Sequence, residues 1–211
     1  MENIDFARVL VAFAVLLVSL TFHEAAHAWS ADRLGDSTAR QLGRVSLNPA
    51  VHIDPIGTIL FPLIAMITNF PIIGWAKPVP VNPHNLGGHW KRKFMAIAAA
   101  GPASNIVLAV VAAAGVRLMG FDTAPGGAGG MVFQFLIFMV IINVLLAVFN
   151  MLPVPPLDGG NVLAGVLRGR AADVFDSLRP YGFLILYGLL FTGVFDRVVF
   201  PISSAIRGWL L

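Results

Sequence analysis

The chain of 211 residues is strongly apolar, with 57% hydrophobic and only 12% charged residues. Its mean hydropathy is +0.82, and the apolar residues fall in long runs rather than at amphipathic spacing, which excludes a soluble globular domain. Cysteine is absent, which excludes disulfides and thiolate chemistry. The formal net charge of only +3 argues against nucleic acid as a partner, and the basic residues are better explained as membrane-topology signals.

Four apolar runs are long enough to cross a lipid bilayer, at about residues 6–31, 94–118, 131–150 and 181–200. Another apolar stretch, residues 55–73, is interrupted by prolines. We therefore expect an all-α polytopic membrane protein with about four to six transmembrane or re-entrant helices. The expected organisation is a single integral-membrane domain over residues 1–211, with a core over 6–165 and a C-terminal helical segment over 181–211.

The first apolar run contains the sequence His23-Glu24-Ala25-Ala26-His27 near its end. Residues four apart lie on one face of a helix, so both imidazoles can hold one Zn²⁺, while Glu24 can act as a general base on water. The five-residue pattern also arises by chance in soluble helices. Here it follows a lipid-length segment, where an unpaired charge costs about 2.5–3.5 kcal/mol or more, so a metal site explains it better.

A catalytic zinc site normally has a third protein ligand and one open position. A downstream glutamate is excluded, because the only glutamates are Glu2 and Glu24. The longer pattern HExxHxxGxxH is also excluded, because Ser30 and Arg33 stand at its glycine and last histidine. The remaining candidates are His52, His84, His89, Asp32, Asp36, Asp54, Asp122, Asp158, Asp173, Asp176 and Asp196.

Asp158 stands out among these candidates because of the backbone around it. It follows the run 131–150 in a stretch that contains three prolines and precedes Gly159-Gly160, so regular helix is interrupted there. Irregular backbone at membrane depth is tolerated only when it is buried in protein or lines a wet cavity. A carboxylate in such a place favours a bound cation.

Three blocks of residues, in this order along the chain, resemble the site-2 protease family of intramembrane zinc metalloproteases. They are His23-Glu24-Ala25-Ala26-His27, Gly101-Pro102-Ala103-Ser104-Asn105, and Asn150-Met151-Leu152-Pro153 running into Leu157-Asp158-Gly159. The resemblance implies one Zn²⁺ per chain held by His23, His27 and Asp158, with Glu24 as general base. It also implies that Asn150 contacts the substrate backbone or the oxyanion. The chain looks like a compact, core-only member without a PDZ domain.

The expected depth of the site sets the topology. The helices that carry His23 and Asp158 must run in the same direction, with 94–118 opposite, so residues 32–93 begin and end on one side. Ten of the 14 basic residues then lie on that side, against Arg8, Arg117, Arg197 and Arg207 on the other, which marks the first side as cytosolic. Residues 55–73 are accordingly expected to be re-entrant, interfacial or a double crossing.

Residues 74–82, Gly-Trp-Ala-Lys-Pro-Val-Pro-Val-Asn, cannot form a helix because of Pro78 and Pro80. We expect a short extended segment near the active site. Both prolines remove donors from the same edge, so the N–H groups of the other edge, with Val79 at its centre, could receive an unwound substrate. An ordinary loop is the alternative.

Asn105 and His52 are two further candidates for contacts with the substrate or the oxyanion. With Asn150 and Val79 they make four such candidates. His52 follows the proposed zinc helix closely, and Asn105 belongs to the second block of the resemblance. His84 and His89 flank Gly87-Gly88 beside a basic cluster and are expected to be solvated.

The function predicted from these features is intramembrane zinc endopeptidase activity on transmembrane segments of substrate proteins. The expected location is a prokaryotic cell membrane, with the active site nearer the cytosolic face. One alternative is a zinc-binding or transport protein of the membrane, although the spans 94–118 and 131–150 offer few polar residues for a transport path. Another is a non-proteolytic relative that binds transmembrane segments, which would be expected to have lost Glu24 or a ligand.

Overall fold

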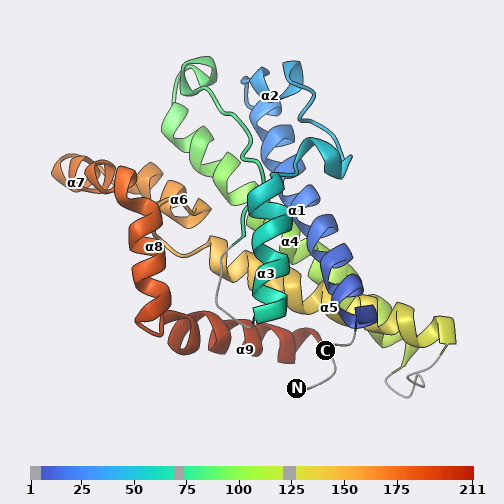
Figure 1. Ribbon diagram of the computed structural model, residues 1–211. Coiled ribbons are helices and arrows are strands. Elements are labelled where there is room, and N and C mark those ends of the chain that lie inside the picture. Colours follow the sequence, from blue (N-terminus) through green and yellow to red (C-terminus); the bar gives the residue numbers. More distant parts are fainter. Residues whose placement is uncertain (1–5, 69–73, 121–126) are drawn as a thin grey trace.

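The computed structural model describes residues 6–68, 74–120 and 127–211, and this part of the chain is helical and contains no strand. Figure 1 shows the arrangement of the helices. The elements are α1 (Phe6–Arg33), α2 (Thr38–Gln41), η1 (Pro49–Val51), η2 (Pro55–Leu60), α3 (Phe61–Thr68), η3 (Pro83–Leu86), α4 (Trp90–Met119), α5 (Gly127–Asn150), α6 (Asp158–Val166), α7 (Arg170–Leu178), η4 (Arg179–Tyr181), α8 (Gly182–Phe191), η5 (Phe195–Val199) and α9 (Phe200–Leu210).

The three long helices α1, α4 and α5 pack against one another and form the centre of the molecule (Figure 1). Their shared core contains Val15 of α1, Ala109, Ala112 and Ala113 of α4, and Met139, Val140 and Val144 of α5. The small alanine side chains of α4 let the helix backbones approach closely, as is common where helices pack inside a membrane. Leu210 of α9 joins the same core, which ties the end of the described chain to the central bundle.

Four helical stretches are long and apolar enough to cross a membrane, namely Phe6–Arg33, Trp90–Met119, Gly127–Asn150 and Arg170–Phe191. The first three agree with the runs expected from the sequence, and the all-α polytopic fold is confirmed. The expected fourth span over 181–200 is wrong in its position. Helix α8 ends at Phe191, Gly193 adopts a φ of +74°, and α9 then runs across the lower end of the bundle (Figure 1).

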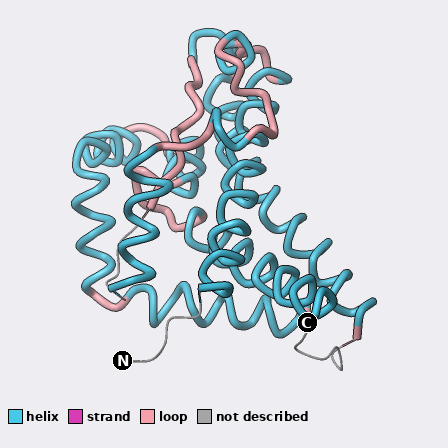
Figure 2. The backbone as a smooth tube through the Cα atoms, turned by 45° about the vertical axis from the view of Figure 1, so that its right-hand side comes forward, coloured by secondary structure: helices cyan, strands magenta, loops and turns pink. Residues whose placement is uncertain are grey.

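The described residues that flank the 55–73 stretch lie next to each other, in agreement with the expectation from the sequence. The N–H of Trp75 donates to the Gly57 carbonyl at 3.0 Å, and the N–H of Lys77 donates to the His52 carbonyl at 2.9 Å. The two ends of the stretch therefore lie side by side, and a single crossing is excluded. The 74–82 segment that follows has no regular secondary structure and is drawn among the loops in Figure 2.

Asp36, which follows α1, holds the chain just before α4. Its fully buried carboxylate accepts hydrogen bonds from the Asn82 N–H at 2.6 Å, the Asn85 side chain at 2.8 Å and the Thr38 hydroxyl at 2.5 Å. Lys93 of α4 adds hydrogen bonds from Nζ to the carbonyls of Leu34 and Leu86. These bonds anchor the C-terminal end of the 74–82 segment above the bundle.

Candidate metal centre and active-site pocket

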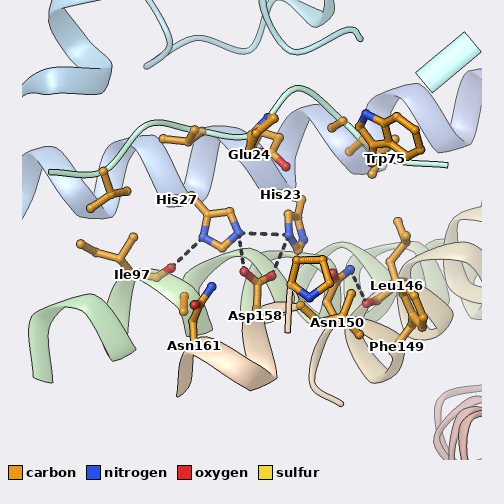
Figure 3. Close-up of a pocket in the computed structure, with 18 of the residues that line it drawn as sticks. His23, Glu24, His27, Trp75, Ile97, Leu146, Phe149, Asn150, Asp158 and Asn161 are labelled. Carbon is orange, nitrogen blue, oxygen red and sulfur yellow. Dashed lines mark hydrogen bonds and ion pairs between the residues drawn. The ribbon is translucent and has the colours of Figure 1, made fainter. Parts of the chain in front are cut away.

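His23 and His27 point from α1 toward the same place between the helices (Figure 3). Their spacing places them one turn apart, and the two Nε2 atoms are 3.1 Å apart. Both residues are buried. The helix thus presents two nitrogen ligands side by side in the interior, at the depth where α4 and α6 meet α1.

Asp158 reaches the two histidines from the first residue of α6. Its Oδ2 lies 3.0 Å from His23 Nε2, and its Oδ1 lies 3.4 Å from His27 Nε2. The chain between α5 and α6 turns tightly beneath it, and a Cβ on Gly159 would stand 2.3 Å from the Met151 carbonyl oxygen. A glycine is therefore required immediately after the aspartate for this turn to form.

With His27 neutral, acceptor atoms of His27 and Asp158 face each other in this cluster. The Nδ1 of His27 is 2.7 Å from the Ile97 carbonyl, which can only accept, so Nδ1 carries the proton and Nε2 presents a lone pair. Asp158 Oδ2 is buried and receives no hydrogen bond within the described residues. Converging acceptors without a donor are costly unless a cation lies between them.

Zinc fits this donor set. Two ligands held about 2.0–2.1 Å from a tetrahedral zinc lie about 3.3 Å apart. The nearest separations here are close to that value: 3.1 Å between the two Nε2 atoms, 3.0 Å from His23 Nε2 to Asp158 Oδ2, and 3.4 Å from His27 Nε2 to Asp158 Oδ1. Gly101 of α4 leaves the necessary room, because a Cβ there would lie 2.4 Å from His27 Nε2 and 2.6 Å from His23 Nε2. The histidines and Asp158 therefore form a group that could hold a metal ion, which we call the His-His-Asp cluster.

A pocket of about 480 Å³ opens beside the His-His-Asp cluster. Glu24, Asn150 and Asn161 contribute polar side chains to its wall. Its apolar wall includes Trp75, Leu146 and Phe149 (Figure 3). Phe183 and Leu186 of α8 also line it. A mostly apolar cavity with a few polar groups is typical of a binding site for a ligand or substrate.

The 74–82 segment forms one side of this pocket through Pro78, Val79 and Val81. The sequence predicts that one edge of this segment keeps its N–H groups, and the Lys77 N–H on that edge already donates a hydrogen bond to the His52 carbonyl. Further along the same edge, no hydrogen bond joins the N–H of Val79 or Val81 to another residue that the structure describes. The edge predicted from the prolines is thus partly used by the protein itself and partly without a hydrogen-bond partner among the described residues.

Arg44 binds the first half of this segment through a hydrogen bond to the Lys77 carbonyl. It is 6% exposed, and its Nη2 donates to the Lys77 carbonyl at 2.5 Å. Burial lowers the pKa of the Arg44 guanidinium below its usual value, and the negative charge of Glu24 partly opposes that change. Arg44 therefore combines a clamp on the 74–82 segment with a positive charge that interacts with Glu24.

The residues singled out from the sequence fall into two groups. His23, Glu24, His27, Val79, Asn150 and Asp158 all line the pocket. Asn105 and His52 lie outside its lining: Asn105 is fully buried with its Oδ1 2.6 Å from His23 Nδ1, and His52 is buried with Nε2 2.8 Å from the Ser46 carbonyl. His84 and His89 are exposed at the surface.

Sequence reasoning did not assign a role to Asn143, Asn161, Arg44 or Gly101. Asn143 was visible only as a polar residue within an apolar run, and Gly101 as part of the second block. Their contacts join positions far apart in the chain, such as Asn143 with Asn105, 38 residues away. No spacing rule within one helix could have found such pairs.

Comparison with known proteins agrees with this site. The model of peptidase family M50 matches residues 126–191, which include Asn150 and Asp158. No solved structure matches the chain significantly.

Two bacterial relatives match nearly the whole chain. YwhC of Bacillus subtilis is 35% identical over 202 residues, covering 93% of this chain and 87% of the relative. Rip2 of Mycolicibacterium smegmatis is 31% identical over 196 residues, covering 92% of this chain and 71% of the relative. Both are named as zinc metalloproteases, which implies a zinc cofactor. The chain belongs to peptidase family M50, the site-2 protease family of zinc metalloproteases.

Proposed function

We propose that this protein hydrolyses peptide bonds within or beside transmembrane segments of other membrane proteins. One observation carries the proposal: the His-His-Asp cluster and Glu24 border a single pocket that lies between helices of membrane-spanning length and the 74–82 segment. A peptide bond that reaches this pocket lies among apolar walls, away from bulk water. The class of substrate follows from that location.

His23, His27 and Asp158 are the proposed zinc ligands. Their mutual distances, the buried positions of the two histidines, and the Asp158 Oδ2 atom, which accepts no hydrogen bond from the described residues, support this assignment. Zinc, when bound, acts as a Lewis acid that lowers the pKa of a coordinated water and polarises a carbonyl group. Three protein ligands are the usual number for a zinc site that keeps one position for chemistry.

Glu24 is the proposed general base. It follows His23 directly, lines the pocket and is 9% exposed. Its carboxylate accepts a proton from the attacking water as the water oxygen bonds to the substrate carbonyl carbon. When the C–N bond breaks, the same carboxylate returns the proton to the leaving amine, so no proton is gained or lost.

Asn150 is the proposed donor to the developing oxyanion. Its Nδ2 donates to the Leu146 carbonyl at 2.9 Å, which uses one of the two amide hydrogens and orients the side chain at the pocket wall. The second hydrogen is then available for the negative oxygen of the tetrahedral intermediate.

The open edge at Val79 and Val81 is the proposed site for the substrate backbone. A helical substrate must unwind before cleavage, because its amides are hydrogen-bonded within the helix. An unwound segment that pairs with this edge would replace some of those bonds and would lie against the pocket.

The proposed setting is a bacterial cell membrane, with residues 1–211 acting as one integral-membrane domain and the active site nearer the cytosol. The relatives are bacterial, and basic residues gather where α1 ends and α4 begins. Gln41, which follows α1, and Arg92, at the start of α4, are both exposed. Each can be changed to cysteine, because the chain has no native cysteine. Both cysteines should react with an impermeant thiol reagent from the cytosolic side, and the opposite accessibility would refute the orientation.

The activity is tested with Glu24→Gln in purified protein and a model transmembrane substrate. We expect cleavage to fall about 10²–10⁴-fold, with about one zinc per chain retained, because the glutamate acts on water and not on the metal. Asp158→Ala is the matched variant, which should lose zinc as well as activity. A wild-type protein that binds zinc without cleaving any transmembrane substrate would favour a non-proteolytic relative.

A further inference from the structure

Ser19, Asn105 and Asn143 form a polar chain in the apolar core between α1, α4 and α5. All three side chains are fully buried. We propose that Asn143 acts through Asn105 to select the tautomer of His23 that presents Nε2 to the metal, which makes Asn143 a positioning residue. The inference rests on the proposed function, because it takes His23 as a zinc ligand.

The chain is continuous from His23 to helix α5. Asn105 Oδ1 lies 2.6 Å from His23 Nδ1, and Asn105 Nδ2 donates to Asn143 Oδ1 at 2.7 Å. Asn143 Nδ2 donates to the Ser19 hydroxyl and to the Met139 carbonyl, both at 2.8 Å. The Ser19 hydroxyl donates to the Val15 carbonyl at 2.7 Å.

Backbone carbonyls give this chain a single direction. The Met139 carbonyl can only accept, so the amide nitrogen of Asn143 must face it, and Asn143 Oδ1 must face Asn105. Asn105 then offers its nitrogen to Asn143 and to the Ser19 carbonyl at 3.3 Å, and its oxygen faces His23. An oxygen in that place needs a proton on His23 Nδ1.

The consequence reaches the metal. With the proton on Nδ1, the lone pair of His23 lies on Nε2, the atom that faces Asp158. If the Asn105 amide were reversed, its oxygen would face two acceptors, the Ser19 carbonyl and Asn143 Oδ1. Buried acceptor pairs of that kind are strongly disfavoured, so the reversed amide and the other tautomer are excluded together.

The two histidines are therefore supported in different ways. His27 is held by the backbone carbonyl of Ile97, which no side-chain substitution removes. His23 is held by two side chains in succession, and the second of them makes no contact with the cluster. Outer partners of metal-ligating histidines typically change metal affinity by about 10–100-fold when they are lost.

The test is zinc affinity, measured by competition with a chelator, in the purified wild type and in Asn143→Leu. We expect Asn143→Leu to weaken zinc binding about 10-fold or more, because the amide nitrogen of Asn105 is then left with only its 3.3 Å bond to the Ser19 carbonyl and fixes the direction of the amide less firmly. Asn143→Ala should show a similar loss, and it is the second variant if leucine does not fit the core. Circular dichroism verifies folding in each case.

Ser19→Ala is the matched control. It removes a hydroxyl of the same buried chain, but the Met139 carbonyl still fixes the direction of Asn143, so zinc affinity should stay close to that of the wild type. Equal losses in Ser19→Ala and Asn143→Leu would mean that the chain serves packing alone, and the proposal would be wrong.

A rescue experiment separates direction from packing more sharply. In the double variant Asn105→Asp with Asn143→Leu, a buried, protonated carboxyl can donate to the Ser19 carbonyl and face His23 with its other oxygen, which only accepts, so it selects the same tautomer without help from α5. Zinc affinity should return to within a few-fold of the wild type. A double variant that binds zinc as weakly as Asn143→Leu would overturn the proposal.

A wild-type protein that binds no zinc would refute the proposed function itself. Strong zinc binding in both the wild type and Asn143→Leu would refute only the role of Asn143.

Discussion

The His-His-Asp cluster and the 74–82 segment border the same pocket but are held very differently. Each member of the cluster is fixed at its own position: His27 by the Ile97 carbonyl, His23 by Asn105, and Asp158 by the tight turn before α6. The 74–82 segment is bound mainly near its two ends, and the edge around Val79 between them makes no hydrogen bond to the described residues. The metal ligands thus have a rigid setting, whereas the segment opposite them can adjust to a bound chain.

Gly101→Ala should have the largest effect, because it acts on the rigid side. The added Cβ would lie 2.4 Å from His27 Nε2, so either the histidine or α4 must move. We expect loss of zinc and of proteolysis, measured by metal analysis and by cleavage of a transmembrane substrate. Gly188→Ala in α8, where a Cβ meets nothing within 4 Å, is the control and should retain both. Full zinc content in Gly101→Ala would show that the cluster is less rigid than its contacts indicate.

Val79→Pro tests the adjustable side. Proline removes the N–H at the centre of the open edge, whereas Val79→Ala trims the side chain and keeps the N–H. We expect the proline variant to lose roughly 5–10-fold in kcat/KM, the value of one hydrogen bond of about 1–1.5 kcal/mol, with zinc content unchanged. The alanine variant should stay near the wild type. Equal activities in the two variants would make this segment an ordinary loop.

Arg44→Met should loosen the clamped end of the same segment. The variant loses the charged hydrogen bond to the Lys77 carbonyl while it keeps much of the side-chain volume. We expect KM for the transmembrane substrate to rise about 10-fold, as for a hydrogen bond worth about 1.5 kcal/mol, with zinc affinity unaffected. Arg44→Lys retains a charged donor, so its KM should lie between those of the wild type and Arg44→Met. A loss of zinc in Arg44→Met would contradict the separation of the two regions.

Much of the metal site and the outline of the fold could be predicted from local patterns. The spacing of His23 and His27 depends only on helix geometry, and the prolines and glycines around Asp158 mark an irregular backbone at membrane depth. Hydropathy located three of the four spans. It misplaced the fourth because an apolar run does not reveal that Gly193 turns the chain.

What the sequence could not provide is pairing between elements. Asn143 and Asn105 become functional candidates only when α4 and α5 bring them together, and Arg44 only when the Lys77 carbonyl lies beside it. The edge at Val79 shows both what the sequence could predict and what it could not. The prolines predict which N–H groups are competent, but only the structure shows that the Lys77 N–H is already bonded to His52.

Asp36→Asn should give the smallest effect, and it tests the other anchored end of the 74–82 segment. Burial alone would raise the pKa of Asp36, but hydrogen bonds from Thr38, Asn85 and Asn82 outweigh it, and the net pKa is below the usual value. A carboxyl whose pKa is lowered in the folded protein stabilises the folded state at pH values above the unfolded pKa of about 3.9, and this contribution is lost as the pH falls through the folded pKa.

In metal-free protein, where zinc release plays no part, Asp36→Asn should be less stable than the wild type by about 1–3 kcal/mol at pH 7. The difference in melting temperature should shrink as the pH falls below about 4. A difference that stayed constant from pH 7 to pH 3 would mean that Asp36 contributes by shape alone and that its charge does not anchor the segment.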